Sequence, residues 1–246
     1  MTTYVYGIAS SSHPALPDGM EGIGRPACPV RVLKNGELAA IVSDAPEDLK
    51  PKRRDLLAHQ NVLSEAGAAG SVLPMRFGSL APDDETVVSV LGERAGHYEE
   101  RLHALDGRVE YNVKATHNEE AVLHQVLADN PELRAMVEAN QRQGGGSHEQ
   151  KLQLGEMITT NVRARETSDA HEVRRALEPA AEAVGDGPEG TGWLANVSFL
   201  VDRKSSETFL AAVEELKSAQ PHLEVRVHGP LPPYSFVDPG PAEPSQ

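Results

Sequence analysis

The chain has 246 residues, a formal net charge of −14 and a single cysteine. Its length allows one large domain or two small ones, and an apolar content of 39% is enough for a packed core. The acidic balance disfavours binding to nucleic acid or to anionic lipid, because both require basic patches. Cys28 alone cannot form an intrachain disulfide or a CxxC zinc site. No stretch approaches the ~20 apolar residues of a membrane span, so we expect a soluble, cytoplasmic protein.

The first predicted elements are a strand and a hairpin. Residues 4–9 are apolar on both faces, which predicts a central strand, and residues 10–29 are rich in Ser, Pro and Gly, which predicts a loop. Two short apolar runs flank Asn35 and Gly36, a pair that favours a type I′ turn. We therefore expect a hairpin over residues 30–42 with this pair at its tip.

Two helices and a short strand complete the predicted first domain. Asp44 and Glu47 have the spacing of a capping box, which predicts a helix reaching about Ala69. Further along the chain, three successive acidic residues, at positions 83–85, predict the start of a second helix. Its apolar residues recur every three or four positions as far as Leu105. A short strand is expected between them, at the start of residues 72–78. This element order predicts a ferredoxin-like α+β sandwich, a mainly antiparallel sheet with helices on one face.

Arg76 is the only charge in the apolar segment 72–78, whose sequence is Val-Leu-Pro-Met-Arg-Phe-Gly. A lone charge next to a buried strand is costly to desolvate unless it is paired. Arg76 is therefore either locked in an internal ion pair or directed into a functional site, where it could act as an anion clamp with His59. The ion pair is favoured, which would make Arg76 a buried clamp. Arg76 and Phe77 are both candidate interface residues.

The pattern restarts after residue 107, which we take as a domain boundary. The second domain is again expected to be α+β, with a capping box at Thr116 and Glu119 opening its first helix. Gly144, Gly145 and Gly146 fall in a predicted loop. In chain order we expect a strand, two helices, this loop, a long helix, a strand, a helix and a strand, at residues 109–115, 116–129, 131–140, 141–148, 149–184, 193–201, 206–216 and 223–228. The predicted domains are residues 1–107 and 108–237.

The segment at residues 229–237 contains three prolines and two aromatic side chains, Tyr234 and Phe236. Its prolines exclude a central strand. The two aromatics either fold back over one domain or are offered to a partner, since aromatic residues are effective interface anchors. Folding back is favoured, and both residues are kept as interface candidates. Residues 238–246 are polar and rich in proline, which predicts disorder.

No specific catalytic, cofactor-binding or metal-binding motif is present in the sequence. The pairs at residues 148–149 and 171–172 begin like HExxH, but neither has the second histidine. His117 and His124 are seven residues apart, about 10 Å along a helix, which is too far for a compact metal site. We therefore predict no catalytic residue, no metal ion and no cofactor.

Three segments, in their order and separation, together resemble the gas vesicle protein F/L (GvpL/GvpF) family: residues 72–78, 109–114 and 229–237. The resemblance covers the chain from Tyr4 to about Val237. It implies a non-enzymatic, cytoplasmic accessory protein associated with gas vesicles. The partners it implies are the small apolar wall protein and other accessory proteins. Many relatives carry a shorter, more basic sequence resembling Gly-Arg-x-Tyr-Leu in place of residues 143–148, so a function tied to that loop is in doubt for this chain.

The expected function is a role in gas vesicle assembly. An apolar wall protein exposes large apolar patches before it assembles. An acidic protein could hold it through a first-domain sheet edge or through the C-terminal aromatic tail. The alternative is a small-molecule-binding or catalytic α+β protein that uses Arg76 and His59, and it requires a pocket with Arg76 at its floor. A third possibility is a structural scaffold with no exposed binding patch.

Overall fold

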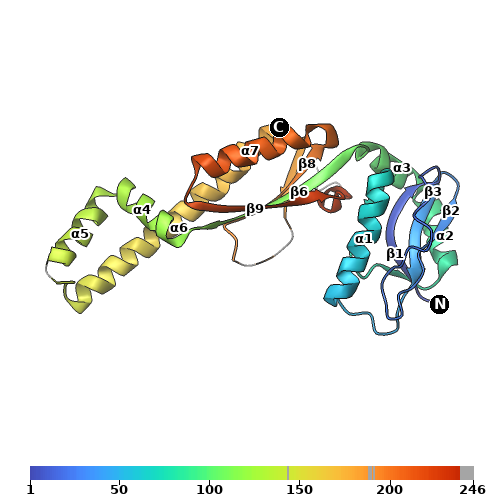
Figure 1. The fold of residues 1–246 in the computed structure, drawn as a ribbon, viewed down its shortest axis with the longest axis horizontal. Coiled ribbons are helices and arrows are strands. Elements are labelled where there is room, and N and C mark those ends of the chain that lie inside the picture. Colours follow the sequence, from blue (N-terminus) through green and yellow to red (C-terminus); the bar gives the residue numbers. More distant parts are fainter. Residues whose placement is uncertain (143, 188–189, 191, 239–246) are drawn as a thin grey trace. The chain divides into compact units, whose positions relative to one another are not determined.

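The structure is a computed structural model that describes residues 1–142, 144–187, 190 and 192–238 (Figure 1). The fold is α+β with two sheets, which confirms the predicted fold class. The chain divides into two compact units. Unit 1 combines Met1–Glu110 with the chain from Gly229 onward, and unit 2 is Tyr111–His228. The C-terminal segment thus belongs with unit 1, whereas the sequence assigned it to the second domain. Disorder was predicted for residues 238–246, and all of these except Asp238 lie outside the described residues.

The helices and strands follow the predicted order with several additions. Up to residue 107 the elements are β1 (Thr3–Ser10), β2 (Arg31–Asn35), β3 (Leu38–Asp44), α1 (Arg53–Ala69), β4 (Val72–Pro74), β5 (Leu80–Ala81), α2 (Asp84–Glu93) and α3 (Ala95–Ala104). The later elements are β6 (Arg108–His117), α4 (Glu119–Asp129), α5 (Pro131–Arg142), α6 (His148–Leu177), β7 (Ala183–Asp186), β8 (Ala195–Asp202), α7 (Ser206–Ala219) and β9 (Leu223–Leu231). Three short 3₁₀ turns are η1 (Glu178–Ala180), η2 (Arg203–Ser205) and η3 (Tyr234–Phe236).

The sheet of unit 1 has the order β2-β3-β1-β4, with β5 also paired to β1, and all of these pairings are antiparallel. The β2–β3 hairpin is confirmed, but its turn lies one residue later than predicted. Asn35 pairs with Leu38, which leaves Gly36 and Glu37 as the two loop residues. Gly36 has φ +59°, and among the described residues only glycines have positive φ. This pattern is that of a type II′ turn, in which glycine is the first central residue.

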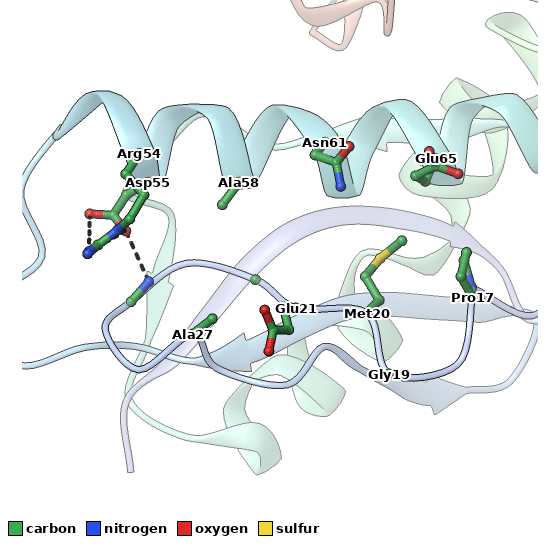
Figure 2. A pocket seen from close by; sticks show the side chains of 12 residues that line it. Pro17, Gly19, Met20, Glu21, Ala27, Arg54, Asp55, Ala58, Asn61 and Glu65 are labelled. Atoms are coloured by element: carbon green, nitrogen blue, oxygen red, sulfur yellow. Dashed lines mark hydrogen bonds and ion pairs between the residues drawn. The ribbon is translucent and has the colours of Figure 1, made fainter.

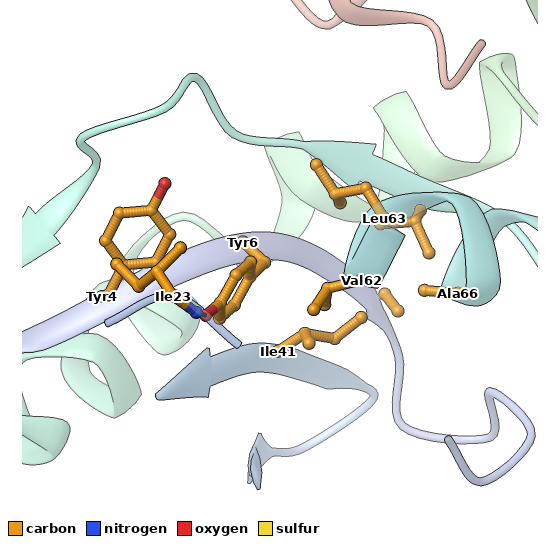
Figure 3. Close-up of a cluster of buried hydrophobic side chains, with 9 residues drawn as sticks. Tyr4, Tyr6, Ile23, Ile41, Val62, Leu63 and Ala66 are labelled. Carbon is orange, nitrogen blue, oxygen red and sulfur yellow. Dashed lines mark hydrogen bonds between the residues drawn. The ribbon is translucent and has the colours of Figure 1, made fainter. Parts of the chain in front are cut away.

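Helices cover both faces of this sheet, rather than one. β3 is buried along six consecutive residues, from Leu38 to Ser43, which requires cover on each side. On one face, α1 packs on a cluster that includes Tyr4 and Tyr6 of β1 (Figure 3). On the other face, α2 and α3 pack against β1, β2 and β3. The members of the α1-face cluster are Tyr4, Tyr6, Ala9, Ile23, Ile41, Val62, Leu63, Ala66 and Val72.

Two helix boundaries in unit 1 differ from the prediction. The capping box of Asp44 and Glu47 does not form, and α1 begins only at Arg53. Proline disfavours helical backbone in the residue before it, and Pro46 and Pro51 therefore delay the start. The second predicted helix is two helices, because the backbone leaves the helical region at Arg94, with φ −113° and ψ 20°.

Unit 2 is built on a four-stranded sheet with the order β7-β8-β6-β9. Its core joins β6, β8 and α7 through three buried aromatic rings. The rings of Tyr111 and Phe209 are stacked with centroids 5.1 Å apart, and Phe199 lies 5.3 Å from Phe209. Val173 and Leu177, in the last two turns of α6, are also fully buried. The C-terminal part of α6 therefore contributes to this core.

The long predicted helix ends earlier than expected. α6 stops at Leu177, and β7 pairs antiparallel with β8 where the sequence predicted the helix to continue. Pro179 cannot donate the backbone hydrogen bond that would continue the helix. The predicted capping box of α4 is also replaced, since Asn118 rather than Thr116 accepts a hydrogen bond at its N-terminus, from Ala121. α4, α5 and the N-terminal part of α6 form a helical arm of unit 2 (Figure 1) with its own apolar cluster.

Candidate docking surface and other functional residues

The segment at residues 75–78 is held by a buried tyrosine–histidine pair. The hydroxyl of Tyr4 donates to Nδ1 of His59 at 2.8 Å and accepts from the backbone N–H of Gly78 at 3.2 Å. Nε2 of His59 donates to the carbonyl of Met75 at 3.1 Å, and since that carbonyl can only accept, the Nε2–H tautomer is the one present. Burial lowers the pKa of His59 from 6.5 to about 4. The imidazole is therefore a neutral structural link.

Arg76 is exposed and forms no ion pair with any residue that the structure describes. The favoured interpretation of Arg76 as a buried clamp is therefore wrong. The backbone carbonyl of Arg76 accepts from Ser79, which turns the chain and directs the side chain outward. Phe77 points the other way, with its ring 5.9 Å from Tyr4 and 5.8 Å from His59. The costly desolvation of Arg76 is avoided by exposure rather than by pairing.

The C-terminal segment folds back onto unit 1. Tyr234 packs against the cluster of Figure 3, and burial raises the pKa of its phenol. Ser235 donates through its backbone N–H and its hydroxyl to the buried carboxylate of Glu110, at 2.8 and 2.7 Å. Arg101 donates to the carbonyls of Phe236 and Val237 at 2.8 and 3.0 Å. Phe236 remains half-buried and is not part of the cluster.

β2 is an edge strand of unit 1, since only β3 pairs with it among the described residues. The side chains of β2 alternate between half-buried and exposed, and Val32 is 42% exposed. Beside the strand is a hollow of about 400 Å³, which we call the β2 hollow. Its apolar lining comes from both the loop after β1 and the strands themselves: Leu16, Met20, Val30, Val32 and Ile41.

A second hollow of about 700 Å³ lies between α1 and the loop before β2 (Figure 2). Met20 from the loop and Asn61 from α1 point into it. Asp55 closes one end, because it accepts from the backbone N–H of Gly24 at 3.0 Å and pairs with Arg54. We call this hollow the α1 groove. Met20 lines both hollows, so the loop separates them.

Three buried side chains of unit 2 come together in an arrangement that sequence reasoning missed. Nε2 of His117 and Nε2 of His222 each lie 2.8 Å from the same oxygen, Oδ2 of Asp169. The sequence had paired His117 with His124 on a presumed helix. The actual partner stands just before β9, which is the neighbour of β6 in the sheet. No local spacing in the sequence signals this pairing.

The catalytic alternative required Arg76 and His59 to converge in a pocket. His59 is buried with both ring nitrogens engaged, and Arg76 points to solvent. Neither residue lines the β2 hollow or the α1 groove. The geometry is therefore that of a structural link for His59 and that of a surface charge for Arg76.

The two-sheet architecture defines a class that is already represented among solved structures. The chain is similar to the crystal structure of GvpF from Anabaena sp. PCC7120, with a TM-score of 0.74 and 26% identity, covering 97% of this chain and 99% of that one. It is also similar to GvpF from Microcystis aeruginosa, with a TM-score of 0.70 and 25% identity, over 96% and 99% of the two chains. The class is therefore that of proteins with the GvpF fold.

The family described as gas vesicle synthesis protein GvpL/GvpF matches residues 2–238, and the chain belongs to this family. A relative named gas vesicle protein F, from Streptomyces sp. (strain CB03234), is 63% identical over 97% of this chain and 100% of its own length. Gas vesicle protein L of the same strain is 27% identical, over 95% of this chain and 92% of its own. The resemblance inferred from the three sequence segments is confirmed. None of the described helices is long and apolar enough to cross a membrane.

Proposed function

We propose that this protein is a non-enzymatic accessory protein of gas vesicle assembly that binds the small apolar wall protein through the β2 edge of unit 1. Its family supports the role in assembly. The observation that carries the choice of surface is the combination, among the described residues, of an unpaired strand edge with a hollow beside it that is partly lined by apolar side chains. The proposed place of action is the cytoplasm, at the forming vesicles, and other accessory proteins are further proposed partners.

The physical basis is strand addition. A segment that pairs with an edge strand gains backbone hydrogen bonds, and pockets for alternate side chains give the pairing its specificity. Every second side chain of an added strand points to one face of the sheet. On the face where Val32 lies, such a side chain would enter the β2 hollow. A wall protein that exposes apolar side chains before assembly has the matching chemistry.

The sequence candidates keep a secondary place in this proposal. Arg76 offers an exposed charge for an acidic partner. Phe236, a half-buried aromatic residue, is the second candidate for a direct contact. Phe77 and Tyr234 contribute to the core cluster of unit 1, which makes them supports of the surface rather than direct contacts.

Val32→Lys tests the proposal, because it places a charge in the β2 hollow without disturbing a buried side chain. Leu210→Lys is the matched control, since Leu210 is 41% exposed on α7 of unit 2. Desolvation of the new charge should reduce capture of co-expressed wall protein by about tenfold or more. Both variants should keep the circular dichroism spectrum of the unaltered protein. Equal capture by the two variants would remove the β2 edge from consideration.

A deletion strain of a vesicle-forming host gives the cellular test. Complementation with Leu210→Lys should restore vesicle numbers, counted by electron microscopy, and complementation with Val32→Lys should not. If deletion itself leaves vesicle numbers unchanged, the protein is a dispensable scaffold and the assembly role is contradicted.

A further inference from the structure

The structure assigns a metal site to unit 2: we propose that His117, Asp169 and His222 bind one divalent transition-metal cation such as Zn²⁺. The three residues come from separate places in unit 2: the end of β6, the C-terminal third of α6 and the residue before β9. Their potential ligand atoms all lie within 4.8 Å of one another. A backbone hydrogen bond of 2.9 Å, from Asn118 to the carbonyl of His222, fixes the two histidine-bearing segments side by side.

The donor set has the chemistry of a zinc site. Two imidazole nitrogens and one carboxylate oxygen suit zinc and its neighbours in the first transition row. Zinc–ligand distances of about 2.0–2.2 Å in a tetrahedron place ligand atoms about 3.4 Å apart. Both Nε2–Oδ2 distances are 2.8 Å, so each imidazole nitrogen must move about 0.6 Å away from that oxygen to reach this spacing. Three ligands leave a fourth position for water.

Crowding of donors around one buried carboxylate oxygen favours a cation over hydrogen bonds alone. The side chains of His117, Asp169 and His222 are only 9%, 8% and 3% exposed. Two imidazole donors converge on one carboxylate oxygen, and a third donor, Nε of Arg165, lies 3.4 Å from that same oxygen. This buried Nε has no hydrogen-bond partner among the described residues. A metal ion would replace both Nε2 protons and relieve the excess of donors around a single acceptor.

Arg165 is the group that opposes binding. Its guanidinium pairs with Asp129 through Nη1 at 2.7 Å, and its charge lies beside Asp169. Metal binding must therefore overcome a neighbouring positive charge, so Arg165→Gln should tighten the affinity for the cation. A purely hydrogen-bonded cluster predicts no such gain.

The test uses the full-length chain, first freed of metal with a chelator and then loaded with Zn²⁺ or with Co²⁺, whose absorption reports tetrahedral coordination. We expect one equivalent to remain after desalting and the thermal unfolding midpoint to rise, because a ligand that binds only the folded state stabilises it. His117→Gln/His222→Gln should weaken binding by at least about 100-fold, since changes outside the ligand shell alone cost 10–100-fold. His97→Gln/His103→Gln is the matched control on two exposed histidines, and it should bind like the unaltered protein.

X-ray absorption of the zinc-loaded, unaltered protein keeps the proposal testable even if a variant does not fold. It should show two imidazole nitrogens at about 2.0–2.1 Å. The proposal is overturned if no equivalent is retained, if the double variant of the cluster binds as well as the control, or if the absorption spectrum shows no imidazole ligands.

Discussion

His59 is neutral in the folded protein near pH 7, because burial lowers its pKa to about 4. Its two ring nitrogens join β1 to the chain after β4, through Tyr4 and the carbonyl of Met75. A charged imidazole donates through both ring nitrogens, so the Tyr4 hydroxyl would have to accept from Nδ1 as well as from the backbone N–H of Gly78. His59 thus holds the segment at 75–78 together with Tyr4 and Ser79, and the side chain of Arg76 faces solvent.

This predicts a stability loss in mild acid. Below the unfolded pKa of 6.5 the unfolded chain takes up a proton that the folded protein does not, so stability falls until the pH reaches about 4. A difference of this size corresponds to about 3 kcal/mol. His59→Gln can still accept from Tyr4 and donate to Met75 but does not titrate. Urea unfolding from pH 7 to 4 should therefore show a smaller loss for this variant.

His103→Gln is the control for the acid experiment, since His103 is exposed on α3. It should follow the pH profile of the unaltered protein. Parallel profiles for His59→Gln and the control would contradict the assignment of a depressed pKa to His59.

At the level of elements, the sequence predicts which helices and strands exist better than it predicts the residues at which they begin and end. The hairpin was predictable from its Asn-Gly pair, but the choice between Asn35-Gly36 and Gly36-Glu37 as the turn depends on the register with β3. α1 lost its first turns to Pro46 and Pro51, a local rule that outweighs the capping spacing of Asp44. These errors come from competing local signals.

Long-range pairing accounts for what the sequence could not predict of the candidate sites. A first-domain sheet edge was expected as a binding surface, but only the strand order shows that β2 lies at one edge of the sheet. The cluster of His117 and His222 depends on β6 and β9 being neighbours, which no spacing along the chain reveals. Tyr234 was expected to fold back over a domain, and its place in the cluster of unit 1 again follows from tertiary packing.

The C-terminal segment should act as a structural part of unit 1. Tyr234→Ala removes a ring from the core cluster and should lower the free energy of unfolding by about 2 kcal/mol, less than the 3–5 kcal/mol of a fully buried aromatic. Phe236→Ala, in the same 3₁₀ turn but outside the cluster, should cost clearly less. Chemical denaturation measures both, and equal losses would contradict the anchoring role of Tyr234.

This anchoring also affects how the aromatic tail can be tested as a binding surface. A chain that ends at Gly229 lacks a side chain of the core as well as the tail itself. Weakened capture of a partner by such a chain would therefore report lost stability together with any lost contact. Phe236→Ala separates the two effects.

At the scale of the whole molecule, each unit has its own sheet and its own buried core. Units with separate cores need not unfold in one cooperative step. The single tryptophan, Trp193, lies in unit 2, under the side chains of Lys114 and Arg226. Its fluorescence therefore reports unit 2, whereas circular dichroism reports both units.

Leu63→Ala should destabilise unit 1 by about 2–5 kcal/mol, because Leu63 is fully buried. The variant should shift a circular dichroism transition and leave the Trp193 transition in place. Leu177→Ala, equally buried in unit 2, should shift the Trp193 transition together with the unit 2 part of the circular dichroism signal and leave the unit 1 part in place. If either variant shifts the transitions of both units together, the two units unfold as one.

Unit 2 lies, in sequence, between the two parts of unit 1. During synthesis, the ribosome therefore releases all of Tyr111–His228 before it releases Tyr234, which completes the unit 1 cluster. Unit 1 can acquire its finished core only after the whole of unit 2 has been synthesised. A prematurely terminated product would expose the apolar side chains that Tyr234 covers, which is a signal for proteolytic removal. The tail thus couples completion of the unit 1 core to prior synthesis of unit 2.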